Sequence, residues 1–483
     1  MAEKRPEIGG RFEIRAFGRD VLIYSAGNGL LLLFGFIQVF IIAKYLSVEG
    51  YGYWQLFMLY STYVGVLHLG FADGILVRWA GKELAQVGSE MRIAFRFLIL
   101  EQVIIIAPLG LLLYLVLRPP LQWIGLMILA YAFIGNLAAF FMLATQAVRK
   151  FKLLTTLNVG RSLFFLLMVI VLLTTGHLNH HYVILAFLAS FLLVLFAFNL
   201  YFRKYLWQEK APVLPLRTYG KENINIGIFV LLGNFVLLLF LTIDRLMVSA
   251  FFTIEQFAIY AFALAVALVA YSFVESVSRV FFPYLSSAAA ELRVRASHLG
   301  EPAIILVWAA ILLGYYPLAR LVEYYLPAYV DSLRIMQILL CTIGFGSLIQ
   351  ILHGNYYKVY RMQRQYFLWG ITTLAVSAIL NLLAIKVWGT LESVAIATLV
   401  GFGLWYIINE LSLRSVLETS GKELGKRIIT LVCYIGAFWL AFFLADWFII
   451  QMLIYIGCFL LLTWLLLYHE VRELVTVAKG LMR

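Results

Sequence analysis

The chain has 483 residues, of which 64% are hydrophobic and only 13% are charged, and its mean hydropathy is +0.94. A soluble core of this length needs far less apolar surface, so the composition excludes an ordinary soluble protein and predicts a chain that lies in a bilayer. Lys and Arg number 37 against 25 Asp and Glu, and their positions, rather than this excess, indicate its meaning. The three cysteines, Cys341, Cys433 and Cys458, lie far apart in apolar segments and predict neither a disulfide framework nor a metal site.

Apolar runs of roughly twenty residues, each long enough to cross the hydrocarbon layer, follow one another along the chain. In order they cover residues 21–43, 53–77, 93–117, 121–147, 154–175, 181–202, 223–248, 255–283, 302–325, 335–357, 366–388, 392–413, 428–446 and 449–468. About twenty polar residues precede the first run, which is too long for the core of a cleavable signal, so that run is expected to be the targeting element. The sequence predicts an all-α polytopic membrane protein with about 14 transmembrane helices.

The basic residues alternate between the two sides of these spans. Connections on one side, which includes both termini, carry 28 Lys and Arg, whereas those on the other side carry 5. Arg96, Arg161, Arg245 and Arg279 fall inside spans. Because cytoplasmic loops are enriched in Lys and Arg, this distribution predicts that both termini are cytoplasmic, and it gives nucleic-acid binding little weight. The longest connection, residues 203–223, is then cytoplasmic, and no soluble domain is predicted.

An internal repeat relates the two halves of the chain. With a shift of 206 residues, "GNGLLLLFGFI" (27–37) falls on "GNFVLLLFLTI" (233–243), and "SVEGYGYW" (47–54) falls on "TIEQFAIY" (253–260). Both copies start on the cytoplasmic side, so the repeat is parallel, and transporters built this way bind substrate between the halves near the midplane. The predicted organisation is an N-lobe at 1–203, a cytoplasmic linker at 204–222 and a C-lobe at 223–415, followed at 416–483 by spans 13 and 14 and a cytoplasmic tail.

Two stretches carry a resemblance to a known family. "IDRLMVSAFFTIEQFAIYAFA" (243–263) resembles the Asp-Arg-containing seventh helix and following turn of Wzx-type flippases for O-antigen or exopolysaccharide. These flippases form the polysaccharide transporter branch of the MOP superfamily, which also holds MATE and MurJ-like proteins. "AKYLSVEGYGYWQL" (43–56), followed by "GFADGILVRWAG" (70–81), resembles the first turn and second helix of the same family.

The resemblance implies a bacterial inner-membrane protein that moves an undecaprenyl-pyrophosphate-linked oligosaccharide from the cytoplasmic to the outer leaflet for cell-surface polysaccharide or lipopolysaccharide biosynthesis. It implies a V-shaped alternating-access fold whose cavity is lined mainly by helices 1, 2, 7 and 8, with helices 13 and 14 flanking a groove for the lipid tail. A polymerase and a chain-length regulator are implied as partners besides membrane lipids, and the flippase itself is expected to be a monomer.

A pyrophosphate head in the membrane needs cationic partners. Arginine suits phosphate because its fork donates two parallel hydrogen bonds and keeps its charge. The candidate phosphate ligands are Arg78, Arg161, Arg245 and Arg279. Alternatively, Arg78 anchors the inner boundary of its span, and Arg279 pairs with Glu275 four residues earlier. Asp244 and Arg245 are adjacent and point about 100° apart on a helix, so each is expected to find its partner elsewhere.

Intramembrane acids are candidates for ion coupling because they bind and release protons in an apolar setting. They are Asp73, Glu101, Asp244 and Glu275, and nothing in the residues separates a coupling H⁺ from Na⁺. Asn28 and Asn234 occupy equivalent places in the repeat and are candidate sugar contacts, the alternative being interhelical hydrogen bonds. No cofactor and no metal site is predicted.

Other function classes fit less well. The sequence holds no P-loop and no catalytic set, and its short outward loops argue against a membrane glycan polymerase or ligase, so no enzyme is predicted. A MATE-type cation-coupled drug antiporter would share the two lobes, but it normally has twelve spans and an acidic cavity. A flippase for the peptidoglycan precursor, lipid II, would also have fourteen spans and a cationic cavity. A flippase for lipid-linked oligosaccharide is the leading interpretation.

Overall fold

Helices account for nearly all of the ordered backbone in the computed structural model, which describes residues 14–208, 215–287 and 290–481 and contains no strand in these ranges. The first helices are α1 (Ile14–Tyr45), α2 (Val48–Ser61), the 3₁₀-helix η1 (Val64–His68), α3 (Phe71–Trp79), α4 (Leu84–Val116), α5 (Leu121–Ala147), α6 (Phe151–Thr174), α7 (His180–Tyr201) and the π-helix η2 (Lys204–Gln208). The next are α8 (Leu216–Phe240), α9 (Ile243–Phe251), α10 (Ile254–Ser287), α11 (Ala290–Leu312), α12 (Tyr315–Tyr325) and the 3₁₀-helix η3 (Pro327–Tyr329). The last are α13 (Ser332–Ser347), the π-helix η4 (Leu348–His353), α14 (Gly354–Val359), α15 (Gln363–Val387), α16 (Leu391–Leu417), α17 (Gly421–Leu444) and α18 (Phe448–Leu481).

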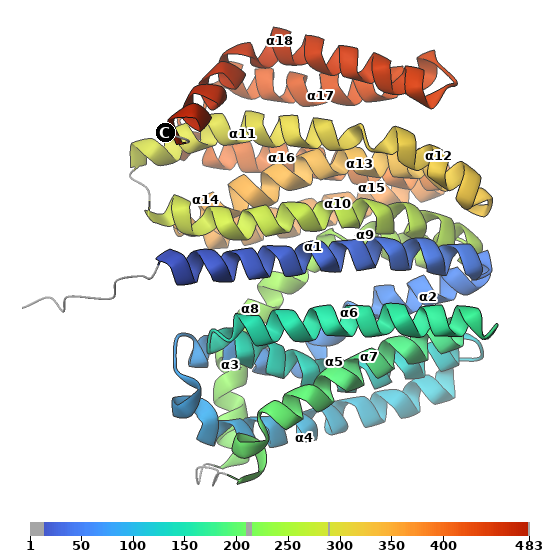
Figure 1. Ribbon diagram of the computed structural model, residues 1–483, viewed down its shortest axis with the longest axis vertical. Helices are drawn as coiled ribbons and strands as arrows, with labels where there is room; N and C mark the ends of the chain where they lie inside the picture. Colours follow the sequence, from blue (N-terminus) through green and yellow to red (C-terminus); the bar gives the residue numbers. More distant parts are fainter. Residues whose placement is uncertain (1–13, 209–214, 288–289, 482–483) are drawn as a thin grey trace, which may run out of the picture.

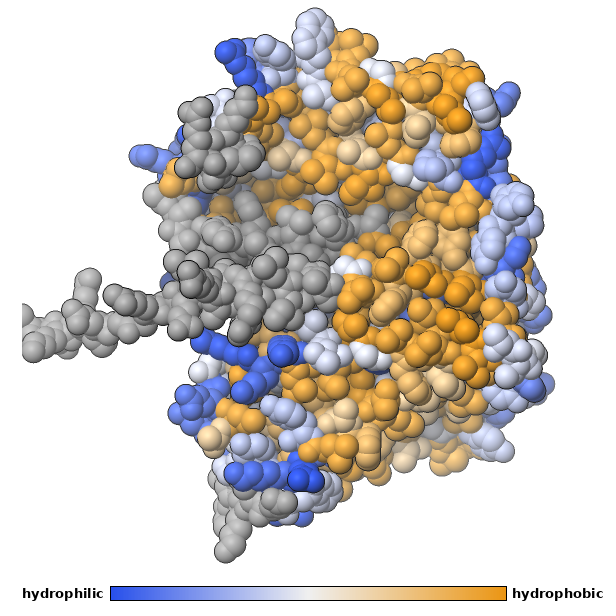
Figure 2. Space-filling view, in the orientation of Figure 1, coloured by the Kyte–Doolittle hydropathy of each residue, from blue (hydrophilic) through white to orange (hydrophobic). Residues whose placement is uncertain are grey.

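Most of the helices lie side by side in one bundle with their axes roughly parallel, whereas α8 runs at a steep angle to them (Figure 1). Hydrophobic side chains cover the middle of the surface, and hydrophilic ones gather near the two ends of the helices (Figure 2). Within the described residues, 11 helices are long and apolar enough to cross a membrane, and Gly29–Tyr45 and Ile254–Val269 form two shorter apolar helices. Because backbone polar groups in hydrocarbon need internal partners, helices are the form an apolar chain takes there. The predicted all-α, multi-pass membrane fold is confirmed.

The bundle has two lobes and two ends. We call α1–α7 the N-lobe and α8–α16 the C-lobe; α17 and α18 pack beyond α11 at one edge of the bundle (Figure 1). The distal end is the end at which α1 finishes, at Tyr45, and the proximal end is the end at which α1 begins. The charge distribution predicts that the proximal end is cytoplasmic. Helix α1 contacts both α6 of its own lobe and α10 of the other lobe.

Four of the predicted spans are interrupted, which the sequence analysis did not anticipate. The span predicted at 53–77 is α2, η1 and α3, and the span predicted at 223–248 is α8 and α9. The spans predicted at 302–325 and 335–357 are likewise divided, the second by the π-helix η4. Helix α8 begins at Leu216, inside the segment expected to be a linker, of which residues 209–214 lie outside the described residues.

Local chemistry explains the first two interruptions. Leu69 and Gly70 both have positive φ, at 47° and 82°, so the chain leaves the helical region between η1 and α3. Glycine is required at position 70 for a second reason, because a Cβ there would lie 2.7 Å from the backbone of Gly227 in α8. Between α8 and α9, the Thr242 hydroxyl donates to the carbonyl of Leu238 (2.6 Å), a bond that competes with the helical ladder.

The buried apolar residues form two separate cores. The larger core joins the distal part of the N-lobe, through Tyr51, Trp54 and Phe57, to the C-lobe. The smaller core fills the proximal part of the N-lobe and includes Trp79 and, from α8, Tyr219. The lobes are therefore continuous at the distal end, whereas at the proximal end the N-lobe has its own core, to which α8 contributes.

Candidate functional site

The chemistry expected of a transport pathway is best developed where α9 begins, between the lobes. Asp244 and Arg245 are both buried there. The Asp244 carboxylate accepts from the backbone N–H of Arg245 (2.8 Å) and from the hydroxyl of Tyr260 in α10 (2.6 Å). The Arg245 guanidinium donates through Nη2 to Gln55 Oε1 of α2 (3.4 Å), and its Nε has no partner among the described residues. The expectation that the two residues find their partners on other helices is confirmed.

Two polar contacts at this point cross from one lobe to the other. One is the bond from Arg245 to Gln55, whose amide also donates to the Tyr51 hydroxyl (2.7 Å). The other is a 2.5 Å bond between the Tyr63 hydroxyl and the Thr242 hydroxyl. Tyr63 follows α2 and Thr242 precedes α9, so both contacts join the two interrupted spans. Movement of the lobes apart at this level requires both contacts to break.

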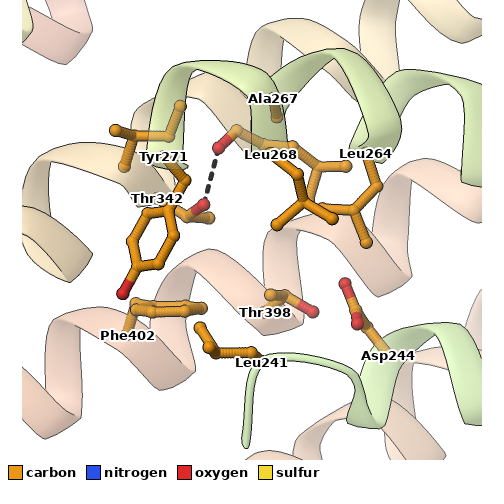
Figure 3. Close-up of a pocket in the computed structure, with 11 residues that line it drawn as sticks. Leu241, Asp244, Leu264, Ala267, Leu268, Tyr271, Thr342, Thr398 and Phe402 are labelled. Atoms are coloured by element: carbon orange, nitrogen blue, oxygen red, sulfur yellow. Dashed lines mark hydrogen bonds between the residues drawn. The ribbon is translucent and has the colours of Figure 1, made fainter. Parts of the chain in front are cut away.

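On its C-lobe side, Asp244 faces a small cavity of about 30 Å³, enough for roughly one water molecule. Figure 3 shows Asp244 and Leu264 on one side of the cavity and Tyr271 and Phe402 on the other, with Leu268 and Thr398 between them. The Thr398 hydroxyl donates to Asn381 Oδ1 (3.4 Å), so oxygen and nitrogen groups continue from Asp244 towards α16 and α15. Oxygen groups around a carboxylate provide a setting in which a proton or a small cation can be held.

Distal to Asp244, aromatic rings close the space between the lobes. The Tyr51 ring of α2 lies 5.4 Å from that of Tyr329 and 6.2 Å from that of Phe262 in α10. Nearer the surface, Lys44 Nζ donates to the carbonyl of Tyr325 (2.6 Å) and lies over that residue's ring. These contacts join the end of α1 and α2 to the C-lobe, so the structure is closed at its distal end.

A second set of contacts between the lobes, which we call the proximal seam, lies where α3 packs against α8; the contacts at the distal end form the distal seam. Glycines allow the backbones to touch: a Cβ added to Gly74 would lie 2.0 Å from the carbonyl oxygen of Asn223. A Cβ added to Gly227 would lie 2.0 Å from the carbonyl oxygen of Gly70. Helix α8 thereby packs on α3 of the N-lobe while it also contacts α15 of the C-lobe, and Figure 1 shows it running at a steep angle to most other helices.

Arg78 lies at the proximal end of α3 and is paired with acids. Its Nε is 3.3 Å from Glu90 Oε2, its Nη1 is 3.3 Å from Glu222 Oε2, and its guanidinium lies over the Tyr219 ring. These groups come from α4 and α8, so Arg78 ties α8 to the N-lobe. A phosphate would have to compete with two carboxylates for this guanidinium.

Arg161 lies inside the N-lobe, away from Arg78 and Arg245. Its guanidinium is 4.4 Å from the centre of the Phe191 ring and 6.0 Å from that of Phe187, both in α7. Its Nε is buried without a partner in the described ranges, and the hydrogen bonds from Gln38 in α1 go to the neighbouring Ser162. No acid pairs with Arg161 among the described residues, so its charge is balanced chiefly by aromatic faces.

The acids Asp73 and Glu101 lie on consecutive helices of the N-lobe, α3 and α4. The Asp73 carboxylate is 3.8 Å from His68 Nε2. Glu101 in α4 is buried, and both of its carboxylate oxygens are without a hydrogen-bond partner in the part of the chain that the structure describes. Beside it, Gln102 donates to the carbonyl of Leu67 (3.0 Å) and accepts from Asn136 (2.8 Å), which holds η1 against α4 and α5.

The remaining candidates are placed as follows. Asn234 lies in α8 with its side chain exposed. Asn28 of α1, and Glu275 and Arg279 of α10, have side chains that lie outside the described residues. Of the ten candidates, the structure brings together only Asp244 and Arg245 among the side chains it describes, whereas Arg78, Arg161, Asp73 and Glu101 each have different neighbours.

Comparison with known families identifies the chain. Residues 17–289, more than half of the sequence, match the family described as polysaccharide biosynthesis protein. The chain belongs to this family. A comparison of the chain with curated protein sequences gives no match.

Solved structures show which fold this polysaccharide biosynthesis protein has. A lipid II flippase MurJ in an inward closed conformation superposes with a TM-score of 0.70 at 14% identity, over 92% of this chain and 98% of that one. An inward-facing MATE multidrug resistance transporter of the MOP superfamily gives 0.57 at 11% identity, over 83% and 100%. The MATE multidrug transporter DinF-BH gives 0.56 at 14%, over 87% and 100%. The predicted MOP-type fold is confirmed, because the chain has the fold of these flippase and transporter structures.

Sequence reasoning missed two members of this site. Gln55 and Tyr260 were not predicted, although each is the polar partner that Arg245 or Asp244 requires. Gln55 had a signal, since it is an amide within an apolar run. Tyr260 had none, because tyrosine is common throughout this sequence and most tyrosines in membrane spans belong to the interface.

Proposed function

We propose that this protein is a flippase that moves an undecaprenyl-pyrophosphate-linked oligosaccharide from the cytoplasmic to the outer leaflet of the bacterial inner membrane. It works by alternating access between its lobes, as a monomer with both termini in the cytoplasm, and serves the synthesis of O-antigen, lipopolysaccharide or another surface polysaccharide. Family membership, the MOP fold and the distribution of basic residues support this proposal. A polymerase and a chain-length regulator are the proposed protein partners.

The environment of Arg245 is the observation that carries the proposal. The guanidinium is buried between the lobes, its Nε has no partner in the described structure, and the one hydrogen bond found there for its Nη2 is a long one to an amide. The neighbouring Asp244 carboxylate is already bonded by a backbone N–H and by Tyr260. A buried guanidinium with unused donors is costly unless an anion satisfies it during the working cycle. The diphosphate of a lipid carrier is such an anion.

The two seams give the proposed cycle its moving parts. The distal seam consists of the aromatic contacts of Tyr51 and the Tyr63–Thr242 bond, and the proximal seam is the glycine contact of α3 with α8. Cargo enters after the proximal seam opens and leaves after the distal seam opens. Arg245 lies on the pathway between them, beside the start of α9. The sugars then meet hydroxyl and amide groups such as those of Tyr63 and Gln55.

Coupling to an ion is proposed at Asp244, whose carboxylate faces the small cavity near Thr398. Either H⁺ or Na⁺ would neutralise the acid and so change the balance of charge around Arg245. A pH-dependent rate that persists in Asp244→Asn, together with an unchanged response to Na⁺, would remove Asp244 from this role. Glu101 and Asp73 are the alternative coupling acids in the N-lobe.

Transport into liposomes tests the proposal. Purified protein is reconstituted with a short polyprenyl-pyrophosphate saccharide, and the saccharide that reaches the opposite leaflet is measured with a membrane-impermeant reagent. Arg245→Ala is expected to slow flipping about 10- to 150-fold, the effect of losing a charge-assisted hydrogen bond. Arg245→Lys keeps the charge without the fork and should fall between the two. The control is Arg295→Ala, since Arg295 is exposed and pairs with Glu473 of α18.

The outcomes separate the residue from the function. Flipping at the wild-type rate in Arg245→Ala, with Arg78→Ala and Arg161→Ala also unaffected, would remove these arginines and leave the flippase class intact. An absence of protein-dependent flipping, combined with cation-stimulated efflux of a cationic drug, would overturn the proposal in favour of the MATE-type antiporter.

A flippase for lipid II is the second candidate, because the structure named as a lipid II flippase superposes over nearly the whole chain with a TM-score of 0.70. Both cargos carry a polyprenyl diphosphate, so Arg245 would serve either. The same liposomes loaded in parallel with lipid II and with a peptide-free saccharide carrier separate the two. Flipping of lipid II alone would replace the polysaccharide cargo by the peptidoglycan precursor.

A further inference from the structure

A buried group of ionisable residues lies in the C-lobe, well away from Asp244 and Arg245 in the chain. It joins Glu301 of α11, His353 of η4, Glu410 of α16 and Arg427 of α17. Glu301, His353 and Glu410 are between 0% and 2% exposed, and only the Arg427 side chain, at 10%, reaches the surface. Four different helices thus contribute one charged or titratable side chain each to a single point near the proximal end.

Every close contact in this group is between charged or proton-carrying atoms. Arg427 Nη1 lies 2.6 Å from Glu301 Oε2 and 3.2 Å from Glu410 Oε2, so one nitrogen bridges two carboxylates. His353 Nε2 is 2.8 Å from Glu410 Oε1. The Tyr406 hydroxyl donates to Glu301 Oε1. His353 Nδ1 is buried and has no partner in the described part of the chain.

The backbone supplies a second observation. His353 ends η4, a six-residue π-helix that divides the tenth predicted span, and the segment continues directly into α14. A π-helix inside a span shifts the following side chains relative to an α-helix and is a costly local geometry that is often found at functional sites. Here the last residue of the π-helix is the one whose ring meets Glu410.

Counting charges shows what the group lacks. Two carboxylates and one guanidinium sum to one negative charge if His353 is neutral, and an unbalanced buried charge is strongly unfavourable. One added proton, on His353 or on a carboxylate, makes the group neutral without any other change. The hydrogen between His353 Nε2 and the Glu410 carboxylate is already supplied by the neutral imidazole in its Nε2–H tautomer, so the added proton comes on top of it.

We propose that Glu301, Glu410 and His353, arranged around Arg427, form a proton-binding site of the C-lobe that holds one exchangeable proton. The proton is not confined to one atom, because the carboxylates and the imidazole exchange it through short contacts. Since its ligands come from α11, η4, α16 and α17, gain or loss of this proton acts on the packing of four helices. The proposal does not depend on which cargo the protein moves.

The other titratable groups that face the site do not alter the count. At the proximal rim, His298 Nδ1 of α11 is 3.4 Å from Arg427 Nη2, and Glu423 of α17 interacts with Arg427 from its largely solvated position. From α14, the phenols of Tyr356 and Tyr357 interact with Arg427 and Glu410 and are uncharged near neutral pH. Helix α10 also packs on η4, but its side chains from 272 to 284 lie outside the described residues.

Thermal unfolding between about pH 5 and pH 9 tests the site in the full-length protein, without any cargo. The folded protein keeps a proton that the unfolded chain releases, so the wild-type midpoint should fall as the pH rises. For one proton and a chain of this length the expected slope is roughly 1 °C per pH unit. Either Glu301→Gln or Glu410→Gln makes the group neutral without the proton and should remove this part of the slope.

The double variant and a control complete the experiment. Glu301→Gln/Glu410→Gln leaves Arg427 buried without a carboxylate, so its midpoint should lie below that of either single variant at every pH. Glu323→Gln removes an exposed carboxylate that pairs with Arg320 and should keep the wild-type slope. The same slope in wild type and in both single variants would overturn the proposal. So would stabilisation of the wild type, and not of Glu410→Gln, by Na⁺ over choline, because a metal cation would then balance the charge.

Discussion

The glycine contact between α3 and α8 allows a sharp test of the proximal seam. In Gly227→Ala, the new Cβ would lie 2.0 Å from the Gly70 carbonyl oxygen and 2.3 Å from the Gly74 amide nitrogen. Real Cβ contacts this short do not occur, and the obstructing atoms belong to backbone, so no side chain can turn aside. Gly233→Ala, six residues further along α8, is the matched control because its Cβ would meet no atom within 4 Å.

The magnitude follows from the difference between these two glycines. Overpacking of a tight contact costs about 1–3 kcal/mol. Both substitutions also gain about 1 kcal/mol of helix propensity, but α8 is helical whether the seam is closed or open, so this gain does not change the balance between the two states. The Gly227→Ala clash exists only in the closed state. The ratio of open to closed protein should therefore rise roughly 5- to 150-fold in Gly227→Ala and stay unchanged in Gly233→Ala.

Distances between spin labels measure this ratio. Labels at Val77 of α3 and Phe229 of α8, both exposed, are attached in a background in which the three cysteines are replaced by alanine. A longer distance should become populated in Gly227→Ala when the protein is placed in lipid nanodiscs. An unchanged distance distribution in Gly227→Ala, or an equal change in Gly233→Ala, would refute the argument that backbone contact holds this seam closed.

Three further substitutions test local energetics by thermal or denaturant unfolding. Tyr63→Phe removes the bond to Thr242 across the lobes and should lower the free energy of unfolding by about 0.5–1.5 kcal/mol; no loss would mean that water replaces the bond without cost. Leu69→Gly relieves a non-glycine residue at φ 47° and should stabilise the fold by up to about 1 kcal/mol, so a clear destabilisation would show that the Leu69 side chain matters more than its backbone. Glu101→Gln replaces a buried carboxylate whose oxygens have no partner among the described residues and should raise stability at neutral pH and flatten its dependence on pH, whereas a lower stability would reveal a cation near Glu101.

The membrane fold was predictable because hydrophobicity and charge act along the chain itself. Long apolar runs and the alternation of basic residues predicted the helices. Asp244 and Arg245 were also correctly expected to need partners from other helices. The interruptions were not predictable in the same way. Gly70 is a visible signal for the first, but the break after Phe240 depends on a side-chain bond from Thr242 to the backbone, a choice that threonine makes only in some helices.

The ionisable group of the C-lobe shows a different limit of sequence reasoning. Glu301 lies one residue before the span predicted at 302–325, and Arg427 one residue before that at 428–446. A charged residue at such a position is usually interpreted as part of a solvated helix end. Glu410 and His353 lie inside the spans predicted at 392–413 and 335–357, and these two residues were the available signals. The packing of α11, α16 and α17 brings these separate residues into one buried group. Packing between segments that are distant in the chain cannot be predicted from the local sequence pattern.

The interrupted spans have a consequence for how the two sides of the membrane are controlled. A continuous helix transmits a tilt from one leaflet to the other, but the short helices α2 and α3 are separated by the 3₁₀-helix η1, and the short helix α9 is separated from the longer α8 by a turn. On the distal side α2 packs against α10 and α9, whereas on the proximal side α3 packs against α8. A substitution that loosens the packing at the proximal end need not disturb the packing at the distal end. The size of the cargo admitted and the ease of its release can therefore be adjusted independently.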